Sequence, residues 1–308
     1  MNTIKIGDCR ETMRQWHSEG KKVQMCVTSP PYFGLRDYGV DGQLGLEQTP
    51  EEYVSTMVDV FRCVKHLLVD DGVLWLNIGD SYAGSGKGRN ADGTHQEGGK
   101  QGTNKGTVTG SLNKTKSPNC KPKDLIGIPW MLAFALRADG WYLRQDIIWH
   151  KPNAMPESVK DRCTKSHEYL FLLSKNQKYY FDAEAIKEPA KWERWGNQTE
   201  KKKHTGTAGH LGNKTLEELP IRDTKNRRSV WSIPTKPYKG AHFATFPPTL
   251  IEPCILAGSK PGDIILDPFM GSGTTAMVAQ QQDRNYLGCE LNSEYEHLWN
   301  ERLIGDLI

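Results

Sequence analysis

Residues 263–275 read DIILDPFMGSGTT, an apolar run followed by a glycine-rich turn. The apolar residues 263–266 predict a buried strand, and residues 276–282 predict a helix that begins directly after the turn. Gly271 and Gly273 permit backbone conformations, and a close approach of a ligand, that a Cβ atom would block. A strand, a glycine turn and a helix in this order are typical of the ligand-binding edge of an open α/β sheet.

An acidic residue follows at the end of the next predicted strand. Glu290 lies fifteen residues after Thr275, where a carboxylate can hydrogen-bond the hydroxyl groups of a ribose. The backbone amides at the start of the predicted helix can face a carboxylate of the same ligand. The turn lacks the GxGxxG spacing of dinucleotide-binding dehydrogenases and the GK[ST] ending of a P-loop. We therefore expect a different ligand that contains adenosine.

The rest of the chain alternates between predicted strands and helices. Strands are predicted at residues 3–7, 23–27, 73–78, 141–149 and 168–174, and helices at residues 50–69, 125–138 and 249–257, with a last helix after Glu290. This alternation predicts an α/β fold with a mostly parallel sheet.

A second motif, TSPPY at residues 28–32, follows the apolar run 23–27. Consecutive prolines fix the backbone and remove two amide donors, which leaves a rigid rim of carbonyl acceptors. This rim suits the exocyclic amine of a flat base. The Ser29 hydroxyl and the Pro30 carbonyl can accept the amine protons while Tyr32 stacks on the ring. These hydrogen bonds would draw the nitrogen toward a tetrahedral geometry, so that its lone pair can attack an electrophilic carbon.

Charge is distributed unevenly along the 308 residues, although the net charge is only +3. Residues 84–123 carry eight basic and two acidic residues with nine glycines, and residues 183–240 carry thirteen basic and seven acidic residues. The first segment is too polar to bury a core, and we expect it to be a mobile basic loop. Two basic insertions in an otherwise acidic chain predict contact with a polyanion.

The composition excludes several classes of protein. The seven cysteines are scattered without a CxxC pair, which predicts reduced thiols rather than a disulfide framework or a zinc site. The first residues, MNTIKIG, do not resemble a signal peptide, and no apolar run approaches the length of a membrane span. We expect a cytoplasmic protein that does not contact a membrane.

Together the two motifs resemble those of the S-adenosylmethionine-dependent DNA amino-methyltransferases of bacterial and phage modification systems. The order, with TSPPY first, a basic region in the middle and DPFMGSGTT last, is similar to the β class of that family. The blocks at residues 72–82, 140–153, 167–175 and 242–255 resemble the family's intervening blocks.

The resemblance implies a Rossmann-like, seven-stranded methyltransferase sheet in permuted motif order. Residues 1–182 would form the catalytic half, including the mobile loop 84–123, and residues 241–308 would form the cofactor-binding half. Residues 183–240 would form the target recognition region between them.

The same resemblance assigns the site residues. The catalytic residues would be Ser29, Pro30, Pro31 and Tyr32. The residues that bind S-adenosylmethionine would be Asp8, Cys9, Asp267, Phe269, Gly271, Ser272, Gly273, Thr274, Thr275 and Glu290. Among these, Glu290 would bind the ribose, and Asp8 and Cys9 would lie beside the adenine. No metal is implied.

The first residue of the tetrapeptide bears on which base is the target. In the family the first position of the tetrapeptide is usually Ser in cytosine-N4 enzymes and Asp or Asn in adenine-N6 enzymes, so Ser29 favours cytosine N4 over adenine N6. Cytosine-C5 methylation needs a nucleophilic cysteine, but Cys254 lies in the apolar run LIEPCILA and is predicted to be a core residue. A non-catalytic DNA-binding protein that retains the fold is the alternative outside the enzymes.

The expected partners follow from this hypothesis. The resemblance implies that double-stranded DNA is the substrate. It allows, as a further partner, a cognate restriction endonuclease that acts on the same site. The chain would be a monomer or a dimer.

Overall fold

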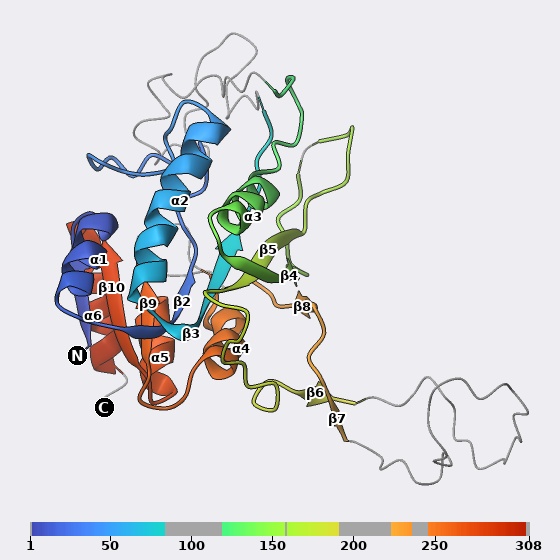
Figure 1. Ribbon diagram of the computed structural model, residues 1–308. Helices are drawn as coiled ribbons and strands as arrows, with labels where there is room; N and C mark the ends of the chain where they lie inside the picture. Colours follow the sequence, from blue (N-terminus) through green and yellow to red (C-terminus); the bar gives the residue numbers. More distant parts are fainter. Residues whose placement is uncertain (1, 84–118, 158, 191–222, 236–245, 306–308) are drawn as a thin grey trace, which may run out of the picture.

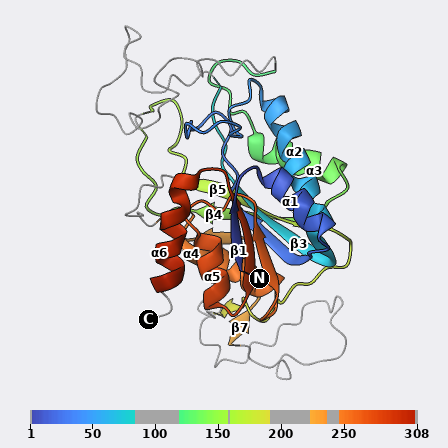
Figure 2. The same cartoon turned by 90° about the vertical axis from the view of Figure 1, so that its left-hand side faces the viewer.

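The computed structural model describes the chain except for residues 1, 84–118, 158, 191–222, 236–245 and 306–308. An eight-stranded sheet runs through the molecule and carries helices on both faces (Figures 1 and 2). Its strands are β1 (Thr3–Ile6), β2 (Val23–Thr28), β3 (Leu68–Ile78), β4 (Tyr142–His150), β5 (His167–Ser174), β8 (Val230–Ser232), β9 (Ile264–Asp267) and β10 (Asn285–Glu290). The helices are α1 (Cys9–Ser18), α2 (Pro50–Leu67), α3 (Ile128–Ala138), α4 (Pro248–Gly258), α5 (Thr274–Gln281) and α6 (Glu296–Gly305).

The strand order in the sheet is β1-β10-β9-β2-β3-β5-β4-β8. β5 runs antiparallel to both of its neighbours, and all other neighbours are parallel, as the alternation of elements predicts. β2, which precedes TSPPY, pairs directly with β9, which precedes the glycine turn. Because parallel strands end at the same edge, the two motifs meet there although they are far apart in sequence.

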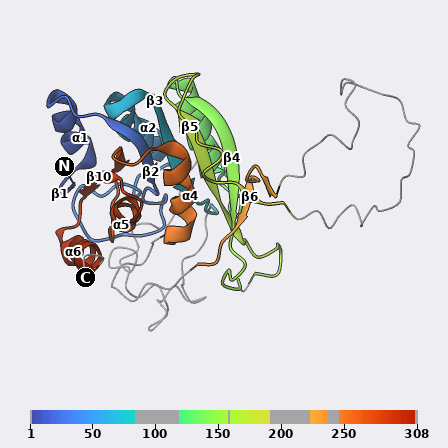
Figure 3. The same cartoon turned by 90° about the horizontal axis from the view of Figure 1, so that it is seen from below.

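Two hydrophobic cores cover the two faces of the sheet. Along β2, Cys26 belongs to one core and Met25 and Val27 belong to the other, which is the alternation that a pleated strand imposes. Helices α1, α2 and α3 bury their apolar residues in the first core, and α4 and α5 bury theirs in the second. Figure 3 shows the same division, with the N-terminal helices on one side of the strands and α4, α5 and α6 on the other.

The predicted seven-stranded sheet is wrong by one strand. Residues Val230–Ser232 form β8, which pairs in parallel with the end of β4 and makes an eighth, edge strand. Trp231 is buried there, and the indole Nε1 of Trp149 on β4 donates to the Ile233 carbonyl at 2.8 Å. A three-residue strand is too short to produce a pattern that could be recognised in the sequence.

Helix α1 is also absent from the sequence prediction. Asp8 caps its first turn by accepting a hydrogen bond from the Arg10 amide at 2.7 Å, and the buried residues follow helical spacing, from Cys9 through Met13 to Trp16. The signal was therefore present in the sequence. By contrast, α2 begins at Pro50, where the sequence predicts a helix, and a capping box formed by Thr49 and Glu52 closes its first turn.

Much of the two basic segments lies outside the described residues. This applies to residues 84–118 of the predicted loop 84–123, and to residues 191–222 and 236–240 of the predicted recognition region 183–240. Within the described part of 183–240, β6 (Glu188–Pro189) and β7 (Thr224–Lys225) form a short antiparallel ribbon in addition to β8. None of the helices that the structure describes has the length and apolar character needed to cross a membrane.

A buried carboxyl group joins the two motif strands. Asp267, at the end of β9, is 1% exposed and accepts hydrogen bonds from the Thr28 hydroxyl and the Thr275 hydroxyl, both at 2.6 Å, and from the Phe269 amide at 3.0 Å. Thr28 ends β2 immediately before Ser29, and Thr275 lies in the first turn of α5. Burial raises the pKa of Asp267, and the hydrogen bonds from Thr275, Thr28 and Phe269 oppose that shift.

We expect Thr28→Val to lower the free energy of unfolding by about 1–3 kcal/mol, because one side of the buried Asp267 carboxyl loses its donor while the side-chain shape is kept. Urea unfolding measures this as a lower midpoint at unchanged slope. Thr164→Val is the matched control, since Thr164 is exposed, and should shift the midpoint far less. Equal midpoints for the two variants would contradict the role of this bond.

Candidate active site

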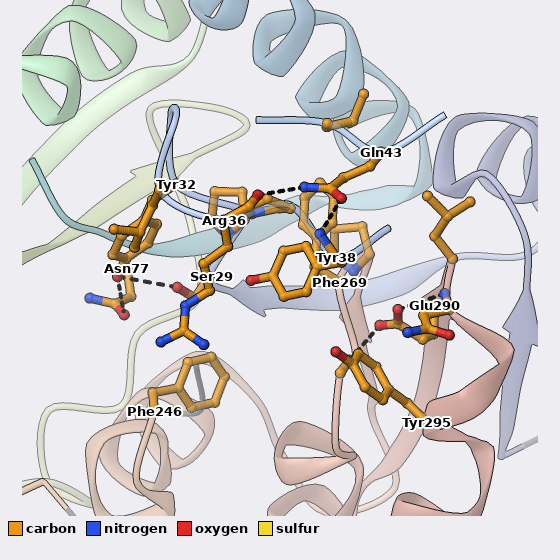
Figure 4. A pocket seen from close by; sticks show the side chains of 18 of the residues that line it. Ser29, Tyr32, Arg36, Tyr38, Gln43, Asn77, Phe246, Phe269, Glu290 and Tyr295 are labelled. Atoms are coloured by element: carbon orange, nitrogen blue, oxygen red, sulfur yellow. Dashed lines mark hydrogen bonds between the residues drawn. The ribbon is translucent and has the colours of Figure 1, made fainter. Parts of the chain in front are cut away.

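A cavity of about 820 Å³ opens where β2, β9 and β10 end, and both motifs line it (Figure 4). The lining includes nine of the residues that the sequence singles out: Asp8, Cys9, Ser29, Pro30, Pro31, Tyr32, Phe269, Gly271 and Glu290. The spatial juxtaposition that the sequence hypothesis requires, with Tyr32 and Gly271 at one site, is therefore present.

The Glu290 carboxylate is held rigidly at one end of the cavity. One oxygen accepts from the Gly271 amide at 2.8 Å and the other accepts from the Asn292 amide at 2.9 Å. Burial raises the pKa of Glu290, while these two amides oppose that shift. Each oxygen keeps further lone pairs, so the group can accept hydrogen bonds from vicinal hydroxyls. Figure 4 shows Phe269 and Tyr295 on the same side of the cavity as Glu290.

Asp8 and Cys9 line this end as well, at the start of α1. The Asp8 carboxylate is occupied by Arg10, whose guanidinium approaches to 2.6 Å, and this hydrogen bond is the main cause of the lowered pKa of Asp8. Burial raises the pKa of the Cys9 thiol to about 12, so the thiol is neutral at physiological pH. Cys9 therefore offers an apolar wall rather than a charge.

Five predicted residues do not line the cavity: Asp267, Ser272, Gly273, Thr274 and Thr275. They lie behind its wall. Gly273 has φ +80°, and a Cβ atom there would lie 2.5 Å from the Cβ of Trp299, so the absence of a side chain allows α6 to pack against the turn. The Thr274 hydroxyl accepts a hydrogen bond at 2.7 Å from Arg302, which also belongs to α6. We propose that these five residues shape the turn and act on the ligand indirectly.

The opposite end of the cavity carries the TSPPY motif. The Tyr53 hydroxyl donates to the Pro31 carbonyl at 2.9 Å, whereas the Pro30 carbonyl accepts none from the described part of the chain. The backbone of Gly79 supports the Tyr32 ring from one side, since a Cβ atom at Gly79 would lie 2.6 Å from the ring atom Cε2. Pro30 is thus the carbonyl that remains available as an acceptor, as the sequence analysis proposed.

Three polar residues at this end were missed by sequence reasoning. The Tyr32 hydroxyl donates to the Glu168 carboxylate at 2.7 Å and lies 3.3 Å from the Asn77 amide oxygen, and Lys151 forms an ion pair with Glu168. Asn77 is the one polar residue in the buried run VLWLNI at residues 73–78, and a polar residue within an apolar strand is the signal that could have found it. Lys151 and Glu168 lie in the blocks at residues 140–153 and 167–175, which point to the family by resemblance but assign no role to either side chain.

Cys254 lies away from the cavity, as predicted. It is fully buried in α4, its thiol lies 3.4 Å from the Leu250 carbonyl, and burial raises its pKa. A neutral core thiol cannot act as a nucleophile toward a base, so the geometry does not support cytosine-C5 chemistry.

A protein-family model described as DNA methylase, N6_N4_Mtase, matches residues 23–301. The chain belongs to this family. It is 50% identical over 301 residues to the Type II methyltransferase M.SmaI of Serratia marcescens, covering 98% of this chain and 90% of that protein. It is 47% identical over 305 residues to the Type II methyltransferase M.Cfr9I of Citrobacter freundii, covering 99% and 88%.

Solved structures show the same fold. The PvuII DNA methyltransferase (cytosine-N4-specific) matches with a TM-score of 0.62 at 19% identity, over 98% of this chain and 86% of that chain. The complex of M1.HpyAVI with S-adenosylmethionine matches with a TM-score of 0.56 at 18% identity, over 98% and 99%. This protein is a DNA amino-methyltransferase of the β class, and its cofactor is S-adenosylmethionine.

The chemistry of the Glu290 end fits that cofactor. A carboxylate fixed by two amides suits the ribose hydroxyls, and the walls formed by Cys9, Phe269 and Tyr295 suit a flat adenine. When bound, the cofactor supplies an electrophilic methyl group. The chain itself contributes the orientation of that ligand toward the TSPPY rim.

We expect Glu290→Gln to weaken S-adenosylmethionine binding about tenfold or more, because an amide nitrogen would replace one of the two oxygens that accept from Gly271 and Asn292. Isothermal titration calorimetry measures the dissociation constant. Glu294→Gln is the matched control, because Glu294 is exposed on the adjacent helical turn. Equal affinities for both variants would place the ribose elsewhere.

Gly79→Ala tests the other end of the cavity. The added methyl group would displace the Tyr32 ring, so the rate of methyl transfer should fall about tenfold or more while S-adenosylmethionine affinity stays unchanged. Single-turnover transfer of a tritiated methyl group gives the rate, and calorimetry gives the affinity. A wild-type rate would show that the position of the ring does not matter.

Proposed function

We propose that this protein transfers a methyl group from S-adenosylmethionine to the N4 amine of a cytosine flipped out of double-stranded DNA, at a specific sequence. The observation that carries the proposal is the shared cavity, with Ser29 and Tyr32 at one end and Gly271 and Glu290 at the other. An amine acceptor and a cofactor-binding carboxylate thus face the same space.

Flipping is required because a stacked base pair hides the amine, and it costs about a few kcal/mol. In the cavity, the Ser29 hydroxyl and the Pro30 carbonyl accept the amine protons and Tyr32 stacks on the base. These contacts direct the nitrogen lone pair toward the Glu290 end, where an N–C bond to the methyl group would form as its bond to the sulfonium sulfur breaks. S-adenosylhomocysteine would leave, and the methylated, cationic nitrogen would lose one proton to solvent. Positioning supplies much of the rate, and no covalent bond between enzyme and base is needed.

Ser29 is the basis for choosing cytosine N4 over adenine N6. It supplies a short, neutral acceptor at the position where adenine-N6 enzymes usually carry Asp or Asn. The cytosine-N4 specificity of the PvuII enzyme, which shares this fold, is compatible with that choice. Adenine N6 is the second candidate, since the family model covers both amines.

The remaining parts of the proposal concern DNA. Residues 183–240 would read the target sequence, with residues 1–182 and 241–308 as the two halves of the catalytic unit. The basic residues of 84–123 and 183–240 would neutralise phosphates, so affinity should fall with salt at a log–log slope of about 0.9 per phosphate. A restriction endonuclease that cuts the same site would be the cognate partner, as the Type II names of the relatives suggest.

Methylation of plasmid DNA by the purified protein tests the function. Nucleoside mass spectrometry should detect N4-methylcytosine, and single-molecule sequencing should place it at one sequence motif. Ser29→Ala and Tyr32→Ala should each lower tritiated methyl incorporation about tenfold or more, because the amine loses an acceptor or the base loses its stacking partner. If the product is N6-methyladenine, the protein is an adenine-N6 methyltransferase, the second candidate. Wild-type incorporation by both variants would refute the site.

A further inference from the structure

The base end of the cavity contains an ion pair that lies outside both motifs. Lys151 follows β4 and Glu168 lies on β5, and their side chains are 19% and 17% exposed. The register of these neighbouring strands pairs Trp149 with Glu168, and the Lys151 ammonium also lies 4.2 Å from the centre of the Trp149 ring. Both side chains line the cavity, so their charges act at the site itself.

The Glu168 carboxylate fixes the direction of the hydrogen bond to Tyr32. A carboxylate has no proton to give, so the Tyr32 hydroxyl must donate across the 2.7 Å contact. Burial raises the pKa of Tyr32, and the hydroxyl therefore keeps its proton. With that proton directed at Glu168, the lone pairs of the Tyr32 oxygen remain for other donors.

The direction of the Tyr32 hydrogen bond also determines the direction of the hydrogen bond between Ser29 and Tyr32. The Ser29 hydroxyl lies 3.4 Å from the Tyr32 oxygen and donates to it. A serine hydroxyl that donates on one side presents its lone pairs on the other, where a target amine would bind. Asn77 is oriented by the same group, because its amide nitrogen lies 3.4 Å from Glu168 and 3.1 Å from the Tyr169 carbonyl. Its carbonyl oxygen is thereby left facing Tyr32.

We propose that Glu168 is a positioning residue that orients the Ser29 hydroxyl as an acceptor for the target amine, through Tyr32, with Lys151 holding the carboxylate in place. This inference rests on the proposed function and extends it to residues beyond the motif. Because Glu168 acts through two hydroxyl groups, its contribution must disappear when the chain is interrupted at Tyr32.

Glu168→Gln is the informative substitution because it keeps the size of the side chain. The Lys151 ammonium offers only donors, so it would bind the amide oxygen of Gln and turn the amide nitrogen toward Tyr32. Tyr32 would then accept rather than donate, and its own proton would turn to Ser29 at 3.4 Å or to the Asn77 amide oxygen at 3.3 Å. In either case the new amide takes a lone pair of the Tyr32 oxygen, so the Ser29 hydroxyl is held less firmly as a donor to Tyr32 and as an acceptor for the amine.

The test is a double-mutant cycle on single-turnover methyl transfer. The substrate is unmethylated duplex DNA that contains the sequence at which the wild-type protein places its methyl group. Glu168→Gln and Tyr32→Phe should each lower the rate about tenfold or more, and the double variant should be within about threefold of the slower single variant. S-adenosylmethionine affinity should stay within about twofold of wild type in all three, because Glu290 is untouched. Glu19→Gln, which alters an ion pair of the exposed Glu19 with Lys21 at the far end of α1, is the matched control and should keep the wild-type rate.

Several results would overturn the inference. Rate losses that multiply in the double variant would show that Glu168 acts independently of Tyr32, as would a wild-type rate for Glu168→Gln. If Glu168→Gln does not fold, Tyr32→Phe decides alone, because it removes the same hydrogen bond from the other side and a wild-type rate would contradict the chain. A wild-type protein that methylates no DNA would instead refute the proposed function.

Discussion

The pairing of β2 with β9 is the constraint on which the site depends. It brings two motifs, separated by more than two hundred residues, to the same edge of the sheet, and the buried Asp267 carboxyl then joins the strand ends through Thr28. The same carboxyl holds the first turn of α5 through Thr275. Burying a carboxyl group is costly, and three donors stabilise this one. An arrangement of the two motifs that removed those donors would leave the carboxyl unpaired, so its burial favours the observed arrangement.

The cavity contains two carboxylates, Glu290 and Glu168, which are held by different kinds of groups. Glu290 is held by backbone amides and is thus fixed by the fold of the turn, in a form suited to the hydroxyl groups of a ribose. Glu168 is held by side chains, with Lys151 on one side and Tyr32 on the other, so its effect is to set the orientation of hydroxyl groups near it. On the proposed function, the first group binds the ribose, whereas the second orients the hydroxyl groups that face the base.

The glycine turn shows how a motif can serve packing and binding together. Gly271 donates its amide to Glu290 inside the cavity, whereas Gly273 is required because Trp299 of α6 occupies the space of a side chain. Two glycines of one motif are thus required for different purposes, one for the cavity and one for the packing of α6. Spacing in the sequence could not separate the two roles, because both glycines also have a positive φ.

Local patterns in the sequence determined most of the elements and both motifs, because periodicity, caps and prolines act within a few residues. They did not reveal β8, whose three residues are held by β4 and by the burial of Trp231. Tertiary structure alone decided the hydrogen-bond partners of Tyr32. Asn77 and Glu168 lie 45 and 136 residues away in sequence, and the pairing of β3 with β5 brings both to Tyr32. Sheet register depends on how whole strands pack, and no single segment carries that information.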